Sequence, residues 1–148
     1  MNEAQNEEIR QWEDLPCDCI VYRAILNRPG RDKVTGRILM KAFLRRGPVG
    51  EKKRDEQGLS VALFPGENLS KDDIINRIRS SYKDCFAIGS LLVGKIRDIQ
   101  TEPRLDVKRN EKNHANITWL PAFEDNETEK ANYLADMLAE ITRPFWNL

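Results

Sequence analysis

The stretch GLSVALFPGENLSKDDIINRIRSSY, residues 58–82, decides the fold class because it predicts a strand, a turn and a capped helix in direct succession. Residues 58–64 are mostly apolar and run into a Pro-Gly pair, which is typical of a strand that ends in a turn. Ser70 and Asp73 have the spacing of a capping box, in which each side chain binds the backbone N–H of the other residue. The helix expected after this cap has one apolar face, formed by Ile74, Ile75, Ile78 and Tyr82.

Apolar runs on both sides of this stretch predict further strands. These runs are residues 19–26, 38–44, 85–99, 105–108 and 114–120. The run 38–44 fits either a strand or a short helix. In the run 85–99, Gly89 and Gly94 would each destabilise a helix by about 1 kcal/mol relative to alanine, which favours a strand that bends at a glycine. The short run 105–108 is expected at an edge of the sheet.

The sequence also predicts a helix close to its C-terminal end. Asn126 and Glu129 can cap the start of this helix, and Pro144 ends it. Its core-facing residues recur at helical spacing and are Leu134, Met137, Leu138 and Ile141. We expect Phe145 and Trp146, which follow the proline, to fold back onto the core or to cover an interface.

Together these elements predict an α+β fold, with a mostly antiparallel sheet of about five strands and two main helices in the order β-β-β-α-β-β-α. A chain of 148 residues has the usual size of one domain, so we expect residues 1–148 to form a single domain. Residues 1–16 are expected to be a loose arm or a short helix. Residues 45–57 contain a single aliphatic anchor, Val49, and predict an exposed, mobile basic loop.

Composition excludes several classes of protein. No run approaches the roughly 18 apolar residues of a membrane helix, and the acidic N-terminal residues do not resemble a secretory signal, so we expect a cytoplasmic location and no membrane contact. The only cysteines are Cys17, Cys19 and Cys85, and the single histidine is His114, so we expect free thiols, no metal site and no cofactor. Walker A, G-x-G-x-x-G and other common catalytic signatures are absent.

Charge is unevenly distributed along the chain, although Lys and Arg total 24 and Asp and Glu also total 24. Residues 28–54 hold ten bases and two acids, a net charge of +8, whereas residues 1–18 and 121–141 each hold six acids and one base. Such a basic segment is typical of a surface that binds phosphates or an acidic protein. The expected binding residues are Arg45, Arg46, Lys52, Lys53 and Arg54. No aromatic residue is interleaved with them, so sequence-specific recognition of bases is not indicated.

Three residues stand out as candidates for catalysis. Arg23 lies inside an apolar run, where a cation either faces a cleft and holds a phosphate or carboxylate, or lies on a partly open face of the sheet. His114 is the only imidazole and could act as a general acid or base, although a single histidine is more often structural. Ser60 could present its hydroxyl in a cleft, but no neighbouring residue in the sequence is a base that would activate it as a nucleophile.

Three short segments resemble those of a family of small bacterial proteins of unknown function. They are VYRAI at residues 21–25, GLSV at residues 58–61, and HANI at residues 114–117 with the Leu-Pro pair that follows at residues 120 and 121. The resemblance covers most of the chain, and it implies no activity.

Two hypotheses about function follow from these features. The first is a small intracellular binding or accessory domain that uses the basic face of residues 28–54 to engage an acidic partner, either a nucleic acid or a protein. The alternative is an enzyme that acts on a phosphorylated or nucleotide substrate, with Arg23 as the anion holder and His114 as the general acid or base. In that case residues 45–57 would serve as a lid, and Arg23 and His114 would have to reach one pocket.

Overall fold

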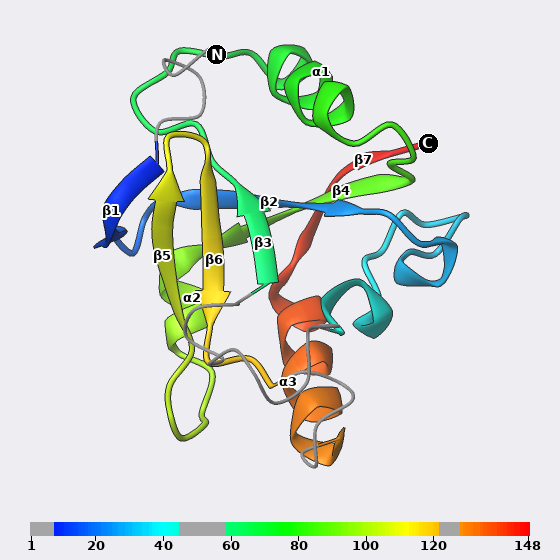
Figure 1. Ribbon diagram of the computed structural model, residues 1–148. Coiled ribbons are helices and arrows are strands. Elements are labelled where there is room, and N and C mark those ends of the chain that lie inside the picture. The colour runs from blue at the N-terminus through cyan, green and yellow to red at the C-terminus, as the bar shows by residue number, and fades with distance from the viewer. Residues whose placement is uncertain (1–7, 45–58, 122–127) are drawn as a thin grey trace.

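Seven strands form one antiparallel sheet in the computed structural model, which describes residues 8–44, 59–121 and 128–148. The strands are β1 (Glu8–Asp14), β2 (Ile20–Ile25), β3 (Leu59–Ala62), β4 (Ala87–Leu92), β5 (Asp106–Glu111), β6 (His114–Thr118) and β7 (Arg143–Asn147). Their order across the sheet is β1-β5-β6-β3-β2-β4-β7, and each neighbouring pair is antiparallel. Figure 1 shows that the sheet is strongly twisted, so that β5 and β6 cross the direction of β2 and β4.

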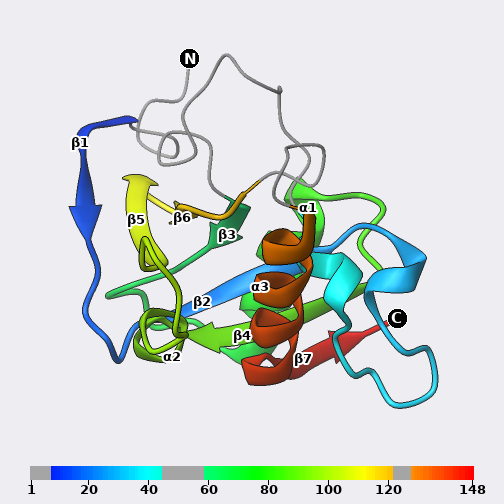
Figure 2. The same ribbon diagram turned by 90° about the horizontal axis from the view of Figure 1, so that it is seen from below.

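Helices cover both faces of this sheet. They are α1 (Lys71–Ser81), α2 (Val93–Arg97) and α3 (Thr128–Ile141), with short 3-10 helices η1 (Arg28–Gly30) and η2 (Met40–Phe43). α1 lies on one face of the sheet and α3 on the other, as the two views at right angles show (Figures 1 and 2). This arrangement confirms the predicted α+β class with an antiparallel sheet.

The two faces of the sheet have separate hydrophobic cores, and β2 contributes to both. Because side chains alternate along a strand, Val21 and Ile25 join the larger core, which includes residues of α2, α3 and η2. Tyr22 and Ala24 join the smaller core, which lies beneath α1. The larger core includes buried residues from β2, β3, β4, β5 and β6, so it connects most of the width of the sheet.

The predicted start of α1 is confirmed in detail. The Ser70 side chain accepts a hydrogen bond from the Asp73 backbone N–H at 3.1 Å, and the Asp73 carboxylate accepts one from the Ser70 N–H at 3.4 Å. Both bonds satisfy N–H groups that the first turn of a helix leaves without partners. Ile75 and Ile78 are buried against the sheet, as the apolar spacing predicts.

The sheet has seven strands rather than about five, because two edge strands were not predicted. Residues 8–14, expected in a loose arm or a helix, form β1, which pairs with β5. Phe145 and Trp146 do return to the core, but they do so within β7, which pairs with β4. Each edge strand is held by backbone pairing with a distant segment, which local apolar patterns do not reveal. β5 consequently lies inside the sheet and not at its edge.

Helices account for a second difference from the prediction. The run 85–99 was expected to be one bent strand, but β4 ends at Leu92 and α2 follows at once. Gly94 is tolerated in this short helix because it lies against the 15–19 segment. Its N–H donates to the Cys17 carbonyl at 2.9 Å, and a Cβ at Gly94 would lie 3.0 Å from the Cys17 Cβ. The open choice for residues 38–44 is resolved in favour of a short helix, η2.

Several sequence expectations lie outside the described residues. These include the whole of the basic loop 45–57, with its candidate binding residues Arg45, Arg46, Lys52, Lys53 and Arg54. Within the described ranges, no helix is both long enough and apolar enough to cross a membrane.

Candidate functional site

Arg23 lies where β2 and β3 separate. The register pair between these strands is Tyr22 with Ala62, and beyond it the strands diverge. Arg23 fills the gap: its Nε donates to the Ala42 carbonyl at 3.0 Å and its Nη1 donates to the Ser60 carbonyl at 2.8 Å. The guanidinium therefore replaces backbone hydrogen bonds that would otherwise link β2 and β3. Its side chain is largely enclosed and does not lie on an open face of the sheet.

No acidic side chain of the described ranges balances the charge of Arg23. Burial lowers the pKa of its guanidinium to about 10, so the group is still a cation at neutral pH. Among the described residues, no carboxylate forms an ion pair with it, and the other ionisable group that acts on it is the Tyr82 phenol. A buried cation without a counter-charge is costly, so this position is the first candidate for an anion site.

A cavity of about 170 Å³, which we call the interstrand cavity, opens beside Arg23. Its lining residues come from β2, β3 and the end of α1, and they are Tyr22, Arg23, Ala24, Leu26, Ser60, Val61, Ala62 and Tyr82. No acidic residue is among them. The polar side chains that could meet a ligand there are Arg23, Ser60 and the two tyrosines.

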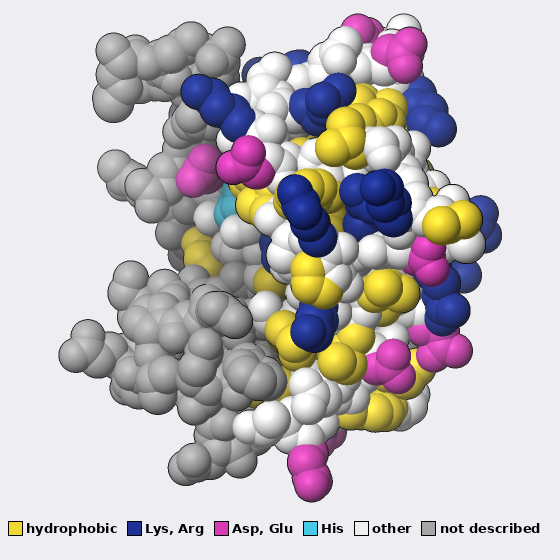
Figure 3. Space-filling view, turned by 90° about the vertical axis from the view of Figure 1, so that its right-hand side faces the viewer, with side chains coloured by type: hydrophobic (Ala, Val, Ile, Leu, Met, Phe, Trp, Pro, Cys, Tyr) yellow, Lys and Arg dark blue, Asp and Glu magenta, His cyan; other side chains and the backbone are white. Residues whose placement is uncertain are grey.

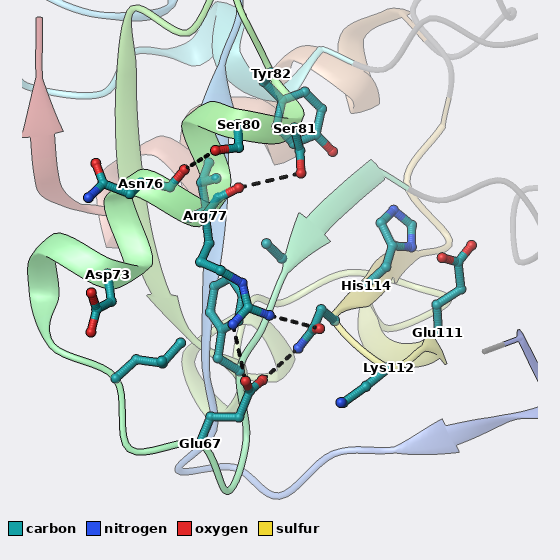
Figure 4. Close-up of a pocket in the computed structure, with 15 residues that line it drawn as sticks. Glu67, Asp73, Asn76, Arg77, Ser80, Ser81, Tyr82, Glu111, Lys112 and His114 are labelled. Carbon is teal, nitrogen blue, oxygen red and sulfur yellow. Dashed lines mark hydrogen bonds and ion pairs between the residues drawn. The ribbon is translucent and has the colours of Figure 1, made fainter. Parts of the chain in front are cut away.

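His114 lines a second and larger hollow of about 910 Å³, which we call the helix groove (Figure 4). α1 forms one wall of this groove, and the turn between β5 and β6 forms the other. The His114 Nδ1 lies 2.6 Å from the Asn110 side-chain oxygen, which fixes the orientation of the ring. Burial lowers the pKa of His114, while the charge of Glu111 acts in the opposite direction. His114 is therefore favoured in its neutral form.

A polar network holds the helix groove together (Figure 4). Arg77 of α1 donates to the Glu67 carboxylate at 3.2 Å and to the Asn113 side-chain oxygen at 3.3 Å. Asn113 in turn donates to Glu67 at 2.9 Å and to the Leu63 carbonyl at 3.0 Å. The hydrogen bond from Asn113, followed by the contact with Arg77, lowers the pKa of Glu67. These bonds satisfy one another, so the network has a structural role.

The three candidate catalytic residues are only partly brought together. Arg23 and Ser60 line the interstrand cavity, whereas His114 lines the helix groove. The two hollows share Ala62 and Tyr82 as walls. The enzyme hypothesis stays a prediction. Sequence reasoning had assigned Tyr82 only to the apolar face of α1, because the position of its hydroxyl depends on how the end of the helix meets the sheet.

Cations and aromatic rings gather on another part of the surface, which we call the basic–aromatic face. The guanidinium groups of Arg28 and Arg31 lie 5.6 and 5.7 Å from the centre of the Phe86 ring. On the same face, Arg79 lies 4.4 Å from the centre of the Trp146 ring. These are cation–π distances. Further basic residues of the described part of segment 28–54 are exposed, namely Lys33, Arg37 and Lys41.

The fold makes this face continuous. Trp146 is the register partner of Ile88 on the neighbouring strand, and Phe86 is two residues before Ile88, so both rings project from the same side of the sheet. Figure 3 shows Lys and Arg side chains spread among apolar ones on this face of the molecule. Arg28, Arg31 and Arg79 form no ion pair with any acidic group that the structure describes. Sequence reasoning missed these aromatic partners because one directly precedes β4 and the other lies in β7, both far from the basic segment.

The cysteines and the possible metal ligands of the described residues form no disulfide and no metal site. Cys17, Cys19 and Cys85 are free thiols, of which Cys17 is exposed and Cys85 is buried. Over the described ranges, no group of three or more His, Cys, Asp or Glu residues is placed to hold a metal ion.

Comparison with protein-family models, with curated proteins and with solved structures found no match for this chain. The resemblance to a family of small bacterial proteins therefore stays a prediction.

Proposed function

We propose that this chain is a binding domain that engages an acidic partner, a nucleic acid or an acidic protein, through its basic segment 28–54 and the adjoining basic–aromatic face. The observation that carries the proposal is the stacking of Arg28, Arg31 and Arg79 on Phe86 and Trp146, with no carboxylate partner among the residues that the structure describes. The loop cations Arg45, Arg46, Lys52, Lys53 and Arg54 belong to the same proposal as continuations of this segment.

Stacking prepares these arginines for anion binding. A guanidinium that lies over a ring keeps its N–H groups at the edge, where they can donate to phosphate or carboxylate oxygens. The ring also restricts the side chain, which reduces the entropy lost on binding. The single described acid of the segment, Asp32, is engaged locally, because its carboxylate accepts the Val34 and Thr35 backbone N–H groups at 2.9 and 3.1 Å. These hydrogen bonds, followed by the nearby charge of Arg31, lower the pKa of Asp32.

Charge reversal tests the proposal. We expect the triple variant Arg28→Glu, Arg31→Glu and Arg79→Glu to lose affinity for a polyanion by at least about tenfold. If the partner is a single strand, the slope of log K against log salt should also fall by about 2, since each phosphate contact contributes about 0.7. The measurement is fluorescence anisotropy with a labelled single-stranded oligonucleotide and, separately, a labelled polyglutamate peptide, over a series of KCl concentrations.

A matched control carries the same change in net charge elsewhere. Lys95, Arg104 and Lys112 are exposed and lie outside the basic–aromatic face, so their reversal to glutamate should leave much more of the affinity intact. The loop variant Lys52→Glu, Lys53→Glu and Arg54→Glu should weaken binding like the first triple variant. Failure of the wild-type chain to bind either polyanion, or equal losses in the control and the first variant, would overturn the proposal.

A further inference from the structure

We propose that the interstrand cavity is a binding site for a small tetrahedral oxyanion, a phosphate or the phosphoryl group of a small ligand, held by Arg23, Ser60 and Tyr82. This site is separate from the basic–aromatic face, and its residues play no part in the binding function proposed above.

The first argument is the charge of Arg23, which no carboxylate in the described part of the chain compensates. A guanidinium has five N–H donors, and at Arg23 two nitrogens are used to hold the Ala42 and Ser60 carbonyls. These two bonds fix the plane of the group without neutralising it. The remaining N–H groups belong to a cation that lines a cavity whose described lining includes no acidic residue, so they are suited to an anion.

The second argument concerns two hydroxyl groups that line the same cavity and have no hydrogen-bond partner among the described residues. Within the described residues, neither the Ser60 nor the Tyr82 hydroxyl takes part in a hydrogen bond, and both side chains line the interstrand cavity beside Arg23. The polar groups that line this cavity therefore come from three elements, β2, β3 and the end of α1. Three donors from different elements suit the several acceptor oxygens of a tetrahedral anion.

The volume of the interstrand cavity and the character of its walls limit the kind of ligand that it can hold. The cavity of about 170 Å³ is much larger than a single water site, which needs about 10–15 Å³, yet it is small for a ligand such as a nucleotide. Its other walls include apolar residues of β2 and β3, namely Ala24, Val61 and Ala62. Apolar walls strengthen the attraction between the cation and an anion by excluding water.

Calorimetric titration of the full chain with inorganic phosphate, at constant ionic strength kept with KCl, tests the site. We expect saturable binding, and we expect Tyr82→Phe and Ser60→Ala each to raise the Kd by about fivefold, the usual effect of one lost hydrogen bond. Both substitutions keep the fold, unlike changes at Arg23 that would strip two backbone carbonyls of their donor. Tyr133→Phe, on the exposed side of α3, is the matched control and should bind phosphate like the wild type.

Further titrations identify the kind of phosphate ligand and separate this site from the basic–aromatic face. Tighter binding of glycerol phosphate than of inorganic phosphate would identify a phosphoryl group of a larger ligand, and the reverse order would identify the free ion. The triple reversal of Arg28, Arg31 and Arg79 should leave phosphate binding intact, so the two sites can fail independently. The proposal is overturned if the wild type does not bind phosphate, or if phosphate binds equally well to the wild type and to both hydroxyl variants.

Discussion

At the scale of single residues, the candidate site could be predicted only in part. Arg23 and Ser60 were identified because polar residues inside apolar runs are unusual, and the structure places both beside one cavity. What the sequence could not show is the divergence of β2 and β3, which turns Arg23 into the donor for the Ala42 and Ser60 carbonyls. Tyr82 was missed for the same reason, since its role depends on three-dimensional placement.

His114 gives a prediction about pH dependence. Burial lowers its pKa in the folded state, so below the unfolded value of about 6.5 the unfolded chain binds more protons than the folded one. The free energy of unfolding should therefore fall as the pH decreases from 6.5 through the folded pKa. We expect His114→Asn, which keeps a donor for Asn110, to lose less stability between pH 7 and pH 5 than the wild type does.

Urea denaturation at both pH values measures this difference. Carboxylates whose pKa is lowered, such as Glu67 and Asp106, also lose stability in acid, but they do so equally in both proteins and cancel in the comparison. Ser60→Ala removes no titrating group and should keep the wild-type pH dependence. Equal losses in the wild type and in His114→Asn would show that the imidazole titrates alike in the folded and unfolded chains.

At the scale of elements, a helix or strand was predicted correctly where its sequence signal lay within a short stretch of the chain. α1 was predicted correctly because its cap and its apolar face lie within about a dozen residues of each other. α2 was missed because the glycine at position 94 is explained by its close contact with Cys17, which lies far away in the sequence. β1 and β7 were missed because edge strands depend on pairing with β5 and β4. Patterns within a window cannot report such contacts.

The cap of α1 provides a quantitative prediction. Ser70→Ala removes the acceptor for the Asp73 N–H and should lower the free energy of unfolding by about 1 kcal/mol. Ser80→Ala is the matched control: its hydroxyl donates to the Asn76 carbonyl inside the same helix, on the exposed side, so its loss should cost only a few tenths of a kcal/mol. Urea denaturation of the two variants under one set of conditions decides the point. If Ser80→Ala proves as destabilising as Ser70→Ala, the capping box does not stabilise α1 as argued.

At the scale of the whole molecule, the features that carry function come from assembly. The basic–aromatic face joins η1, α1, β7 and the residue before β4, and the interstrand cavity joins β2, β3 and the end of α1. Neither set of residues is contiguous in the sequence, so the sequence could indicate only some of their members, such as Arg23, Ser60 and the basic segment 28–54. The basic–aromatic face and the interstrand cavity both form only if the two halves of the sheet stay packed in one arrangement.

That dependence leads to a prediction about cooperativity. The larger core contains buried residues of five adjacent strands, from β5 to β4, so the two halves of the sheet should unfold together as a single domain. Trp12 on β1 and Trp146 on β7 report from opposite edges of the sheet. We expect a variant that keeps only Trp12 and a variant that keeps only Trp146, with the other tryptophans replaced by phenylalanine, each to unfold in one transition. In each variant the fluorescence midpoint in urea should equal the midpoint from far-ultraviolet circular dichroism of the same variant. Each variant is compared with itself, so changes in stability caused by the substitutions do not affect the comparison. If the two midpoints of a variant differ, the sheet unfolds as two units and the prediction is wrong.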